Sequence, residues 1–181
     1  MNADECIRGR RSVRSYKEEA VSEEEIRDIV ETTRFAPSWA NTQCVRYLVV
    51  RNTEVKGRLA EIMSDKNPAR KAVREGPVVV VFLAKRGLAG HKNGEAVDDR
   101  PWHLFDAGGA VQTFCLAAHE RGLGTVIVGY FDAAAAAEIL GIPPGFDVVA
   151  FTPLGRPAQT PPAPPRKSVD ALLSWESFQE A

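Results

Sequence analysis

Pro77-Val78-Val79-Val80-Val81-Phe82-Leu83 is an uninterrupted apolar run dominated by the β-branched residue valine. A strand with one face in water alternates apolar and polar side chains, whereas a strand covered on both faces stays apolar along its length. The run therefore predicts a strand at the centre of a sheet. Two further strands are expected at residues 47–50 and 148–151, and residues 125–130 predict a short strand or an extended loop.

Helical patterns alternate with these strands. Ser22 and Glu25 form a capping box, and the apolar spacing that follows predicts an amphipathic helix over residues 22–35, which Pro37 ends. The same spacing predicts helices over 55–63, 104–118 and 132–140, and residues 66–75 are charged and helical in character. The order of elements is therefore mixed α and β.

Two adjacent glycines, Gly108 and Gly109, lie inside the helix predicted at residues 104–118. We expect this helix to be central and buried. Each glycine in a helix costs about 1 kcal/mol relative to alanine, so helix propensity does not explain the pair. Close packing against another backbone, or a ligand, is the better explanation.

Length and composition indicate one domain over residues 1–181. The chain has 181 residues, of which 44% are hydrophobic and 26% charged, as in an ordinary soluble globular protein. The net charge of −1 provides no overall field that would attract nucleic acid or an anionic membrane. Because no apolar run approaches the roughly 20 residues of a membrane span, and residues 1–6 do not resemble a signal peptide, we expect a cytoplasmic protein.

The cysteines and histidines do not form a recognisable metal or disulfide pattern. Cys6, Cys44 and Cys115 are far apart and odd in number, which indicates free thiols. The three histidines, at positions 91, 103 and 119, are not spaced with carboxylates as metal ligands are. No metal site is therefore expected.

Two segments fall outside these elements. Residues 85–100 are rich in Gly, Asn and charge, which predicts a long irregular connection of the kind that covers a site. Residues 157–181 are expected to form a proline-rich extended segment followed by a C-terminal arm. The apolar residues of 169–178 need a partner surface, and the two possibilities are a helix-like arm on another protomer and docking on the same domain.

Arg10-Arg11-Ser12-Val13-Arg14-Ser15-Tyr16 places three guanidinium groups and two serine hydroxyls within seven residues. A guanidinium is always charged and presents a planar fork of donors, which suits a phosphate. A solvated basic cluster is the alternative for this stretch taken alone.

The order of the motifs along the chain is more specific than any one of them. The arginine stretch is followed by Pro37-Ser38-x-x-Asn41-x-Gln43, by Asp106-x-Gly108, by residues 122–125 and 129–132, and by Arg166-Lys167. In this order the chain resembles the FMN-dependent nitroreductase family in its short, single-domain form. The resemblance extends from Ile7 to about Leu173.

The resemblance implies an α+β fold in which helices flank a mainly antiparallel central sheet, and an intertwined homodimer with FMN at its interface. It places the FMN phosphate at Arg10, Ser12 and Arg14, with Arg11 adjacent. Arg166 would bring a further cation to that phosphate from the C-terminal segment. Pro37, Ser38, Asn41 and Gln43 would line the flavin ring from the other protomer, and Gly129 and Tyr130 would lie at the N5 edge.

The implied activity is an oxidoreductase that takes a hydride from NADH or NADPH onto FMN and passes it to a small-molecule acceptor by ping-pong turnover. Nitroaromatics, quinones and activated alkenes are the expected acceptors, and no side chain is assigned a catalytic role. A specialised enzyme of the same fold, either a reductive dehalogenase or a flavin-fragmenting enzyme, is one alternative. A flavin-binding regulator without turnover is the other.

Overall fold

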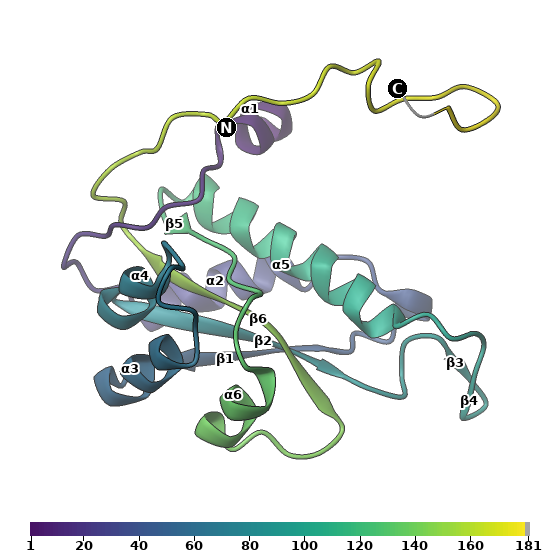
Figure 1. Cartoon of the computed structure of the whole chain (residues 1–181), viewed down its shortest axis with the longest axis horizontal. Coiled ribbons are helices and arrows are strands. Elements are labelled where there is room, and N and C mark those ends of the chain that lie inside the picture. The colour runs from purple at the N-terminus through teal and green to yellow at the C-terminus, as the bar shows by residue number, and fades with distance from the viewer. Residues whose placement is uncertain (180–181) are drawn as a thin grey trace.

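Four strands form one antiparallel sheet in a computed structural model that describes residues 1–179. The strand order is β1-β2-β6-β5, and each neighbouring pair is antiparallel (Figure 1). The strands are β1 (Val45–Val50), β2 (Val78–Lys85), β6 (Phe146–Gly155) and the short β5 (Gly124–Thr125). The predicted mainly antiparallel sheet with flanking helices is therefore confirmed.

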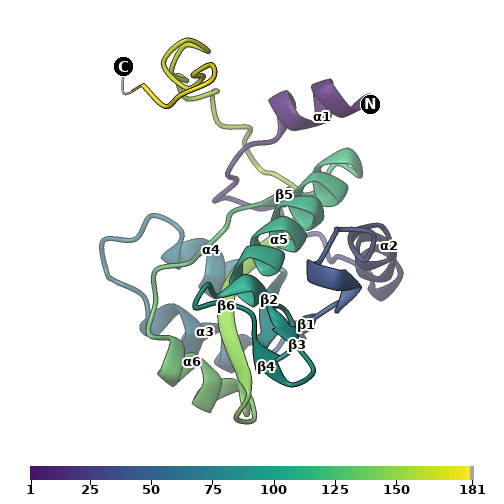
Figure 2. The ribbon, with the colours of Figure 1, turned by 90° about the vertical axis from the view of Figure 1, so that its right-hand side faces the viewer.

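Strand β2 is covered on both faces, as its composition predicted. Val78, Val80 and Phe82 pack on the side of α2 (Glu23–Thr33) and α5 (Trp102–Glu120). Val79, Val81 and Leu83 pack on the opposite side, with α3 (Thr53–Glu61) and α6 (Ala133–Leu140). Figure 2 shows these two helical layers on either side of the sheet. All six side chains are at most 8% exposed, so this strand divides the core into two halves.

Two helix starts follow the capping-box rule. The Ser22 hydroxyl accepts a hydrogen bond from the Glu25 N–H, and the Glu25 carboxylate accepts one from the Ser22 N–H, so α2 begins where it was predicted. The same reciprocal pair joins Asn2 and Glu5 and begins a helix that was not predicted, α1 (Ala3–Gly9). The helical character expected over residues 66–75 is confined to α4 (Arg70–Glu75).

The strand expected at residues 125–130 is only partly formed. Regular pairing ends at Thr125 because the next donor, the Val126 N–H, bonds to the Thr152 hydroxyl at 3.1 Å. Pairing resumes at one isolated bridge between Val128 and Phe151. Residues 126–130 therefore form an extended loop beside β6, the second of the two forms expected.

The connection over residues 85–100 is more ordered than its composition indicated. It contains a short hairpin of β3 (His91–Lys92) and β4 (Glu95–Ala96). Asp98 fastens the end of this connection to α5 by accepting a hydrogen bond from the Trp102 indole N–H at 3.0 Å. The Arg100 guanidinium lies over the same indole, 4.5 Å from the ring centroid.

Helix α5 is buried on one face and exposed on the other. Val111, Phe114 and Cys115 lie in the core, whereas Gly108 and Gly109 are exposed. A Cβ atom added to either glycine would meet nothing within 4 Å. The expectation of a central, buried helix is therefore confirmed for one face only, and nothing in residues 1–179 of the same chain packs against the glycine pair.

The C-terminal segment leaves the sheet after β6 and passes α1 before it extends away from the rest of the chain (Figure 1). Residues 169–178 contain turns and bends and no helix, so the helix-like form of the arm is wrong, whereas its contact with another protomer stays a prediction. Docking on the same domain is also wrong, because Val169, Leu172, Trp175 and Phe178 are between 71% and 86% exposed. Residues 180–181 of the predicted arm lie outside the described residues. Within the described part of the chain, no helix is both long enough and apolar enough to span a membrane.

Candidate functional site

The arginine stretch runs beside the edge of the sheet formed by β5. The Val13 N–H donates to the Thr125 carbonyl at 2.8 Å, and further along the Ala158 N–H donates to the Ser15 carbonyl at 2.9 Å. Gly124 permits this approach, since a Cβ there would lie 2.8 Å from Val13. The backbone that carries the arginines is therefore fixed by the sheet.

Tyr16 closes this segment. Its hydroxyl donates towards the carbonyls of Val13 and Pro153, at 2.7 and 3.2 Å. Burial raises the pKa of the Tyr16 hydroxyl, so the group stays protonated and remains a donor. These bonds join the end of the arginine stretch to the end of β6.

The guanidinium groups on this segment have no carboxylate partners. None of Arg10, Arg11 and Arg14 forms an ion pair within residues 1–179. Arg11 donates to the Arg8 and Arg10 carbonyls at 2.6 and 2.9 Å, and Arg14 donates to the Ser12 carbonyl at 3.2 Å. The buried Arg10 Nε has no hydrogen-bond partner among the described residues. The positive charge of this segment is therefore available to an anion.

A cavity of about 310 Å³ opens beside Arg10 and Arg11, and His119 lines it from the last turn of α5. The buried His119 Nε2 has no hydrogen-bond partner within the described chain. Burial, and then the nearby charges of Arg10 and Arg11, lower the pKa of His119. An anionic group in this cavity would meet two guanidinium groups and would relieve the repulsion that disfavours the imidazolium ion.

A second hollow, of about 260 Å³, continues past Arg14. Lys71 of α4 lines it with Arg14, Ser15 and Tyr16. Lys71 was not predicted as a site residue from the sequence. Its position in the charged segment before the central strand was the available indication. The Asn67 amide accepts a hydrogen bond from the Ala69 N–H at 2.9 Å, so this side chain stabilises a turn.

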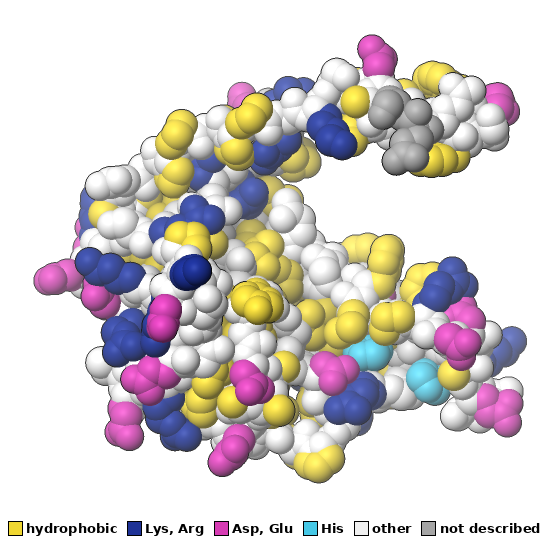
Figure 3. Space-filling model, in the orientation of Figure 1, with side chains coloured by type: hydrophobic (Ala, Val, Ile, Leu, Met, Phe, Trp, Pro, Cys, Tyr) yellow, Lys and Arg dark blue, Asp and Glu magenta, His cyan; other side chains and the backbone are white. Residues whose placement is uncertain are grey.

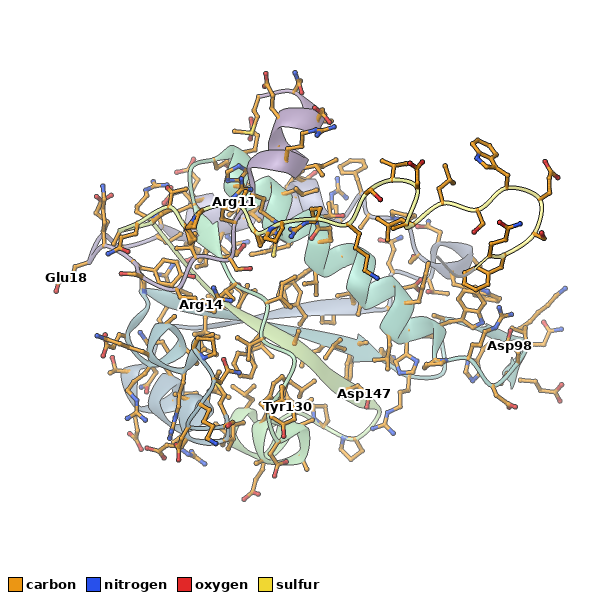
Figure 4. The ribbon with its side chains drawn as sticks, turned by 45° about the horizontal axis from the view of Figure 1, so that its top comes forward. Arg11, Arg14, Glu18, Asp98, Tyr130 and Asp147 are labelled. Atoms are coloured by element: carbon orange, nitrogen blue, oxygen red, sulfur yellow. The ribbon has the colours of Figure 1, made fainter. Side chains whose placement is uncertain are left out.

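Tyr130 lies on the same face of the molecule as Arg11 and Arg14 (Figure 4). Gly129 precedes it in the connection between β5 and α6, and Tyr130 is 77% exposed. A Cβ atom added to Gly129 would meet nothing within 4 Å, so the backbone there is open to a flat ligand. On this face, Lys and Arg side chains gather over the N-terminal segment and α4 (Figure 3).

Pro37, Ser38, Asn41 and Gln43 form a separate group. They lie on the loop between α2 and β1, around the short 3-10 helix η1 (Trp39–Asn41), and Pro37, Ser38 and Gln43 line a cavity of about 110 Å³. This cavity shares no lining residue with the two hollows around the arginines. Within one chain, therefore, the structure brings residues 10–14 and 129–130 to one face and leaves residues 37–43 apart.

Helix α5 separates the two groups. Asp106, near its start, contacts the loop, whereas His119, near its end, lines the arginine cavity. At 1.5 Å per residue, these two positions are about 20 Å apart along the helix axis. Arg166 lines neither of the two hollows around the arginines, and its guanidinium donates to the carbonyls of Pro164 and Pro165.

The described residues contain no group of three or more His, Cys, Asp or Glu side chains that would hold a metal ion. The site is instead cationic at one end and open to a flat group at the other. These are the properties of a site for a phosphate-bearing ring system.

Comparison with known proteins identifies the family. The family model described as "Nitroreductase family" matches residues 7–75 and 64–156. The FMN reductase [NAD(P)H] of Bacillus subtilis is 28% identical over 181 residues, covering 93% of this chain and 71% of that protein. Iodotyrosine deiodinase 1 of Sus scrofa is 29% identical over 194 residues, covering 93% of this chain and 66% of that protein.

A solved structure shows the same fold. The NADPH:FMN oxidoreductase from Vibrio harveyi, complexed with NAD⁺, superposes with a TM-score of 0.84 at 27% identity, and the match covers 98% of this chain and 78% of that one. Together with the match to the family model, which spans most of residues 7–156, this establishes that the chain belongs to the nitroreductase family.

Proposed function

We propose that this protein is an FMN-dependent oxidoreductase that uses NADH or NADPH to reduce a small-molecule electrophile by ping-pong turnover. One observation carries the proposal: among the described residues, Arg10, Arg11 and Arg14 have no carboxylate partner, and the buried Arg10 Nε has no hydrogen-bond partner. Arg11 and Arg14 share a face with Tyr130, which follows the open backbone at Gly129. FMN matches this arrangement, because it joins a dianionic phosphate to a flat ring. The likeness to an FMN reductase that uses NAD(P)H supports the choice of cofactor.

Each predicted residue has a role in this proposal. Arg10, Ser12 and Arg14 hold the phosphate, with Arg11 adjacent, and Arg166 adds a further cation when the C-terminal segment closes over the site. Gly129 and Tyr130 present backbone to the N5 edge of the ring. When bound, FMN supplies the hydride chemistry. The protein binds and orients it, and no side chain is assigned a proton transfer.

The second group of residues reaches the same flavin from another copy of the chain. A two-fold axis that lies along the exposed face of α5, perpendicular to the helix, would make the two copies of this helix antiparallel. The start of one helix, which residues 37–43 contact through Asp106, would then lie beside the end of the other, where His119 lines the arginine cavity. Gly108 and Gly109 lie on this face and would allow the two helices to approach closely. Pro37, Ser38, Asn41 and Gln43 would line the ring of the partner's flavin in this homodimer.

The experiment is reconstitution with FMN, followed by turnover with NADH and NADPH. The proposal predicts a yellow dimer with one FMN per chain, which oxidises NAD(P)H when a nitroaromatic, a quinone or an activated alkene is added. Failure to retain flavin after addition of FMN would refute the proposal.

The likeness to iodotyrosine deiodinase makes reductive dehalogenation the second candidate. A halogenated phenol belongs in the same panel of acceptors. Halide release at a higher rate than the reduction of every nitroaromatic or quinone tested would favour the dehalogenase. Flavin binding without reduction by either nicotinamide would favour a regulator.

A further inference from the structure

Asp106 is a buried carboxylate on the second turn of α5, and it reaches a loop far away in the sequence. The side chain is 4% exposed. Both of its oxygens accept the Trp39 N–H at 3.1 Å, and its Oδ2 accepts the Cys44 thiol at 3.6 Å. These partners lie at the start and just beyond the end of the segment 38–43, which carries Ser38, Asn41 and Gln43.

The segment between these two contacts has an unusual backbone. Ala40, Asn41 and Gln43 have φ angles of 45°, 54° and 48°, in the left-handed region. This conformation costs a residue with a Cβ about 1–2 kcal/mol, so three of them within four positions persist only where other contacts hold them. The Gln43 N–H donates to the Ser38 hydroxyl and the Asn41 N–H to the Ser38 carbonyl, each at 2.9 Å. The Thr42 N–H donates to the Trp39 carbonyl at 3.0 Å, and the Arg46 guanidinium donates to the Gln43 carbonyl at 2.7 Å.

The Trp39 N–H is a donor that local structure leaves without a partner. It belongs to the first residue of a 3-10 turn, where no preceding carbonyl of the turn is in reach. Asp106 supplies the missing acceptor and forms no ion pair within residues 1–179. A buried carboxylate without a counter-charge is costly unless hydrogen bonds compensate it, so packing alone does not explain an acidic residue at this position.

Cys44 extends the same network. Burial, and then the neighbouring Asp106 carboxylate, raise the pKa of the Cys44 thiol to about 11. The thiol therefore stays protonated and donates to the carboxylate. Asp106 thus holds both ends of the segment, Trp39 at the start and Cys44 just after Gln43.

We propose that Asp106 is a positioning residue, which holds residues 38–43 in the conformation that lets Ser38, Asn41 and Gln43 meet the flavin ring, with left-handed backbone at Ala40, Asn41 and Gln43. The inference rests on the proposed function. If only a fraction of the chains keeps the loop conformation that meets the flavin, the apparent affinity for flavin equals the intrinsic affinity multiplied by that fraction. Asp106 therefore acts on affinity through the loop, without contact to the cofactor.

The test compares Asp106→Asn with wild type for the affinities of FMN and riboflavin. The amide keeps the shape but loses the charge and one acceptor oxygen. We expect both flavins to bind about 10- to 100-fold more weakly, the equivalent of one charge-assisted hydrogen bond, because the loop meets the ring that both flavins share. In the flavin-free protein, hydrogen exchange of the amides of residues 39–43 should become faster.

A control separates positioning from general stability. Asn52→Ala removes the cap of α3, in which the Asn52 amide accepts the Val55 N–H at 3.0 Å, and lowers stability away from the loop. Its flavin affinities and its exchange at residues 39–43 should equal those of wild type. Equally weakened flavin binding in both variants would show that Asp106→Asn acts only through stability and would overturn the proposal.

Rescue provides the sharper readout. Ala40→Gly removes the steric cost of the left-handed backbone at position 40, and in the Asp106→Asn background it should recover flavin affinity about fivefold. In wild type, where the loop is already held, it should change affinity little. Unchanged affinity in Asp106→Asn, or no recovery in the double variant, would overturn the positioning role while leaving the proposed function intact. A wild-type protein that binds no flavin would instead overturn the proposed function, and with it the role of the loop in flavin binding.

Discussion

Gly124→Ala tests how the arginine segment is held against the sheet. The new Cβ would lie 2.8 Å from Val13 Cβ and Cγ2 and 2.9 Å from Cγ1, which is closer than carbon atoms pack. Rotation of the Val13 side chain gives no relief, because its Cβ is itself one of the atoms in conflict. The backbone must therefore move, and the nearest bond to be strained is the 2.8 Å hydrogen bond from the Val13 N–H to the Thr125 carbonyl.

The cost follows from overpacking a buried contact. Val13 is 4% exposed, so the strain cannot be released into solvent. Insertion of a methyl group into such a contact costs about 1–3 kcal/mol, which for a chain of this size lowers the melting temperature by roughly 2–12 °C. Gly57→Ala is the matched control. Gly57 lies inside α3 with nothing within 4 Å of an added Cβ, so the same substitution there should stabilise by up to about 1 kcal/mol.

The assay is urea and thermal unfolding of the flavin-free protein, followed by titration with FMN. Because the displaced segment carries Arg10 and Arg14, we expect Gly124→Ala also to weaken FMN binding. Val13→Gly removes the Cβ and both Cγ atoms that the new methyl group would meet, so the double variant should be more stable than the sum of the two single effects predicts. A Gly124→Ala protein as stable as wild type, or single effects that simply add, would refute this description of the contact.

The remaining predictions concern charge at Arg14, His119 and Cys44. In binding titrations, Arg14→Ala should weaken FMN binding by about 1.5–3 kcal/mol and leave the affinity for riboflavin unchanged. Arg27 is exposed, so Arg27→Ala should change neither affinity. Equal weakening of FMN and riboflavin binding by Arg14→Ala would exclude a phosphate role. The His119 pKa, measured by NMR titration, should lie below 6.5 in the free protein and rise with FMN but not with riboflavin. His119 has a lower pKa in the folded chain than in the unfolded chain, so the unfolded chain binds a proton there at a higher pH. The free energy of unfolding should therefore fall as the pH decreases below about 6.5, and His119→Gln should reduce that fall. Cys44, with a pKa near 11 rather than 9.0, should carry about 100-fold less thiolate at pH 8 than an ordinary thiol, and mass spectrometry after iodoacetamide treatment should find it labelled only when urea is present.

Local signals made much of the fold predictable. The valine run predicted the central strand because both faces of β2 are covered, and the capping box at Ser22 predicted the start of α2. The matching box at Asn2 and Glu5 was equally visible in the sequence and would have predicted α1. Where tertiary contacts compete with local pattern, prediction failed, as at Val126, whose N–H bonds to a side chain instead of a neighbouring strand.

The site was predictable in its residue types but not in its arrangement. The arginine stretch indicated a phosphate, and among residues 1–179 these arginines have no carboxylate partners. Arg10 and Arg11 line one hollow and Arg14 lines the other. The contact between Asp106 and Trp39 joins residues that are 67 positions apart, and no local pattern encodes it. Gly108 and Gly109 of α5 and the apolar C-terminal segment contact nothing in the described part of their own chain that would explain them. Their surroundings could not be predicted, because a single sequence does not distinguish contacts within a chain from contacts to a second copy.

Anaerobic mixing of the FMN-loaded protein with NADH or NADPH decides whether the bound flavin turns over. We expect the yellow absorption of oxidised flavin to bleach with at least one of the two nicotinamides, and to return when a nitroaromatic or a quinone is then added. Flavin that stays oxidised with both nicotinamides would contradict the oxidoreductase function and would make this protein a flavin-binding protein without turnover.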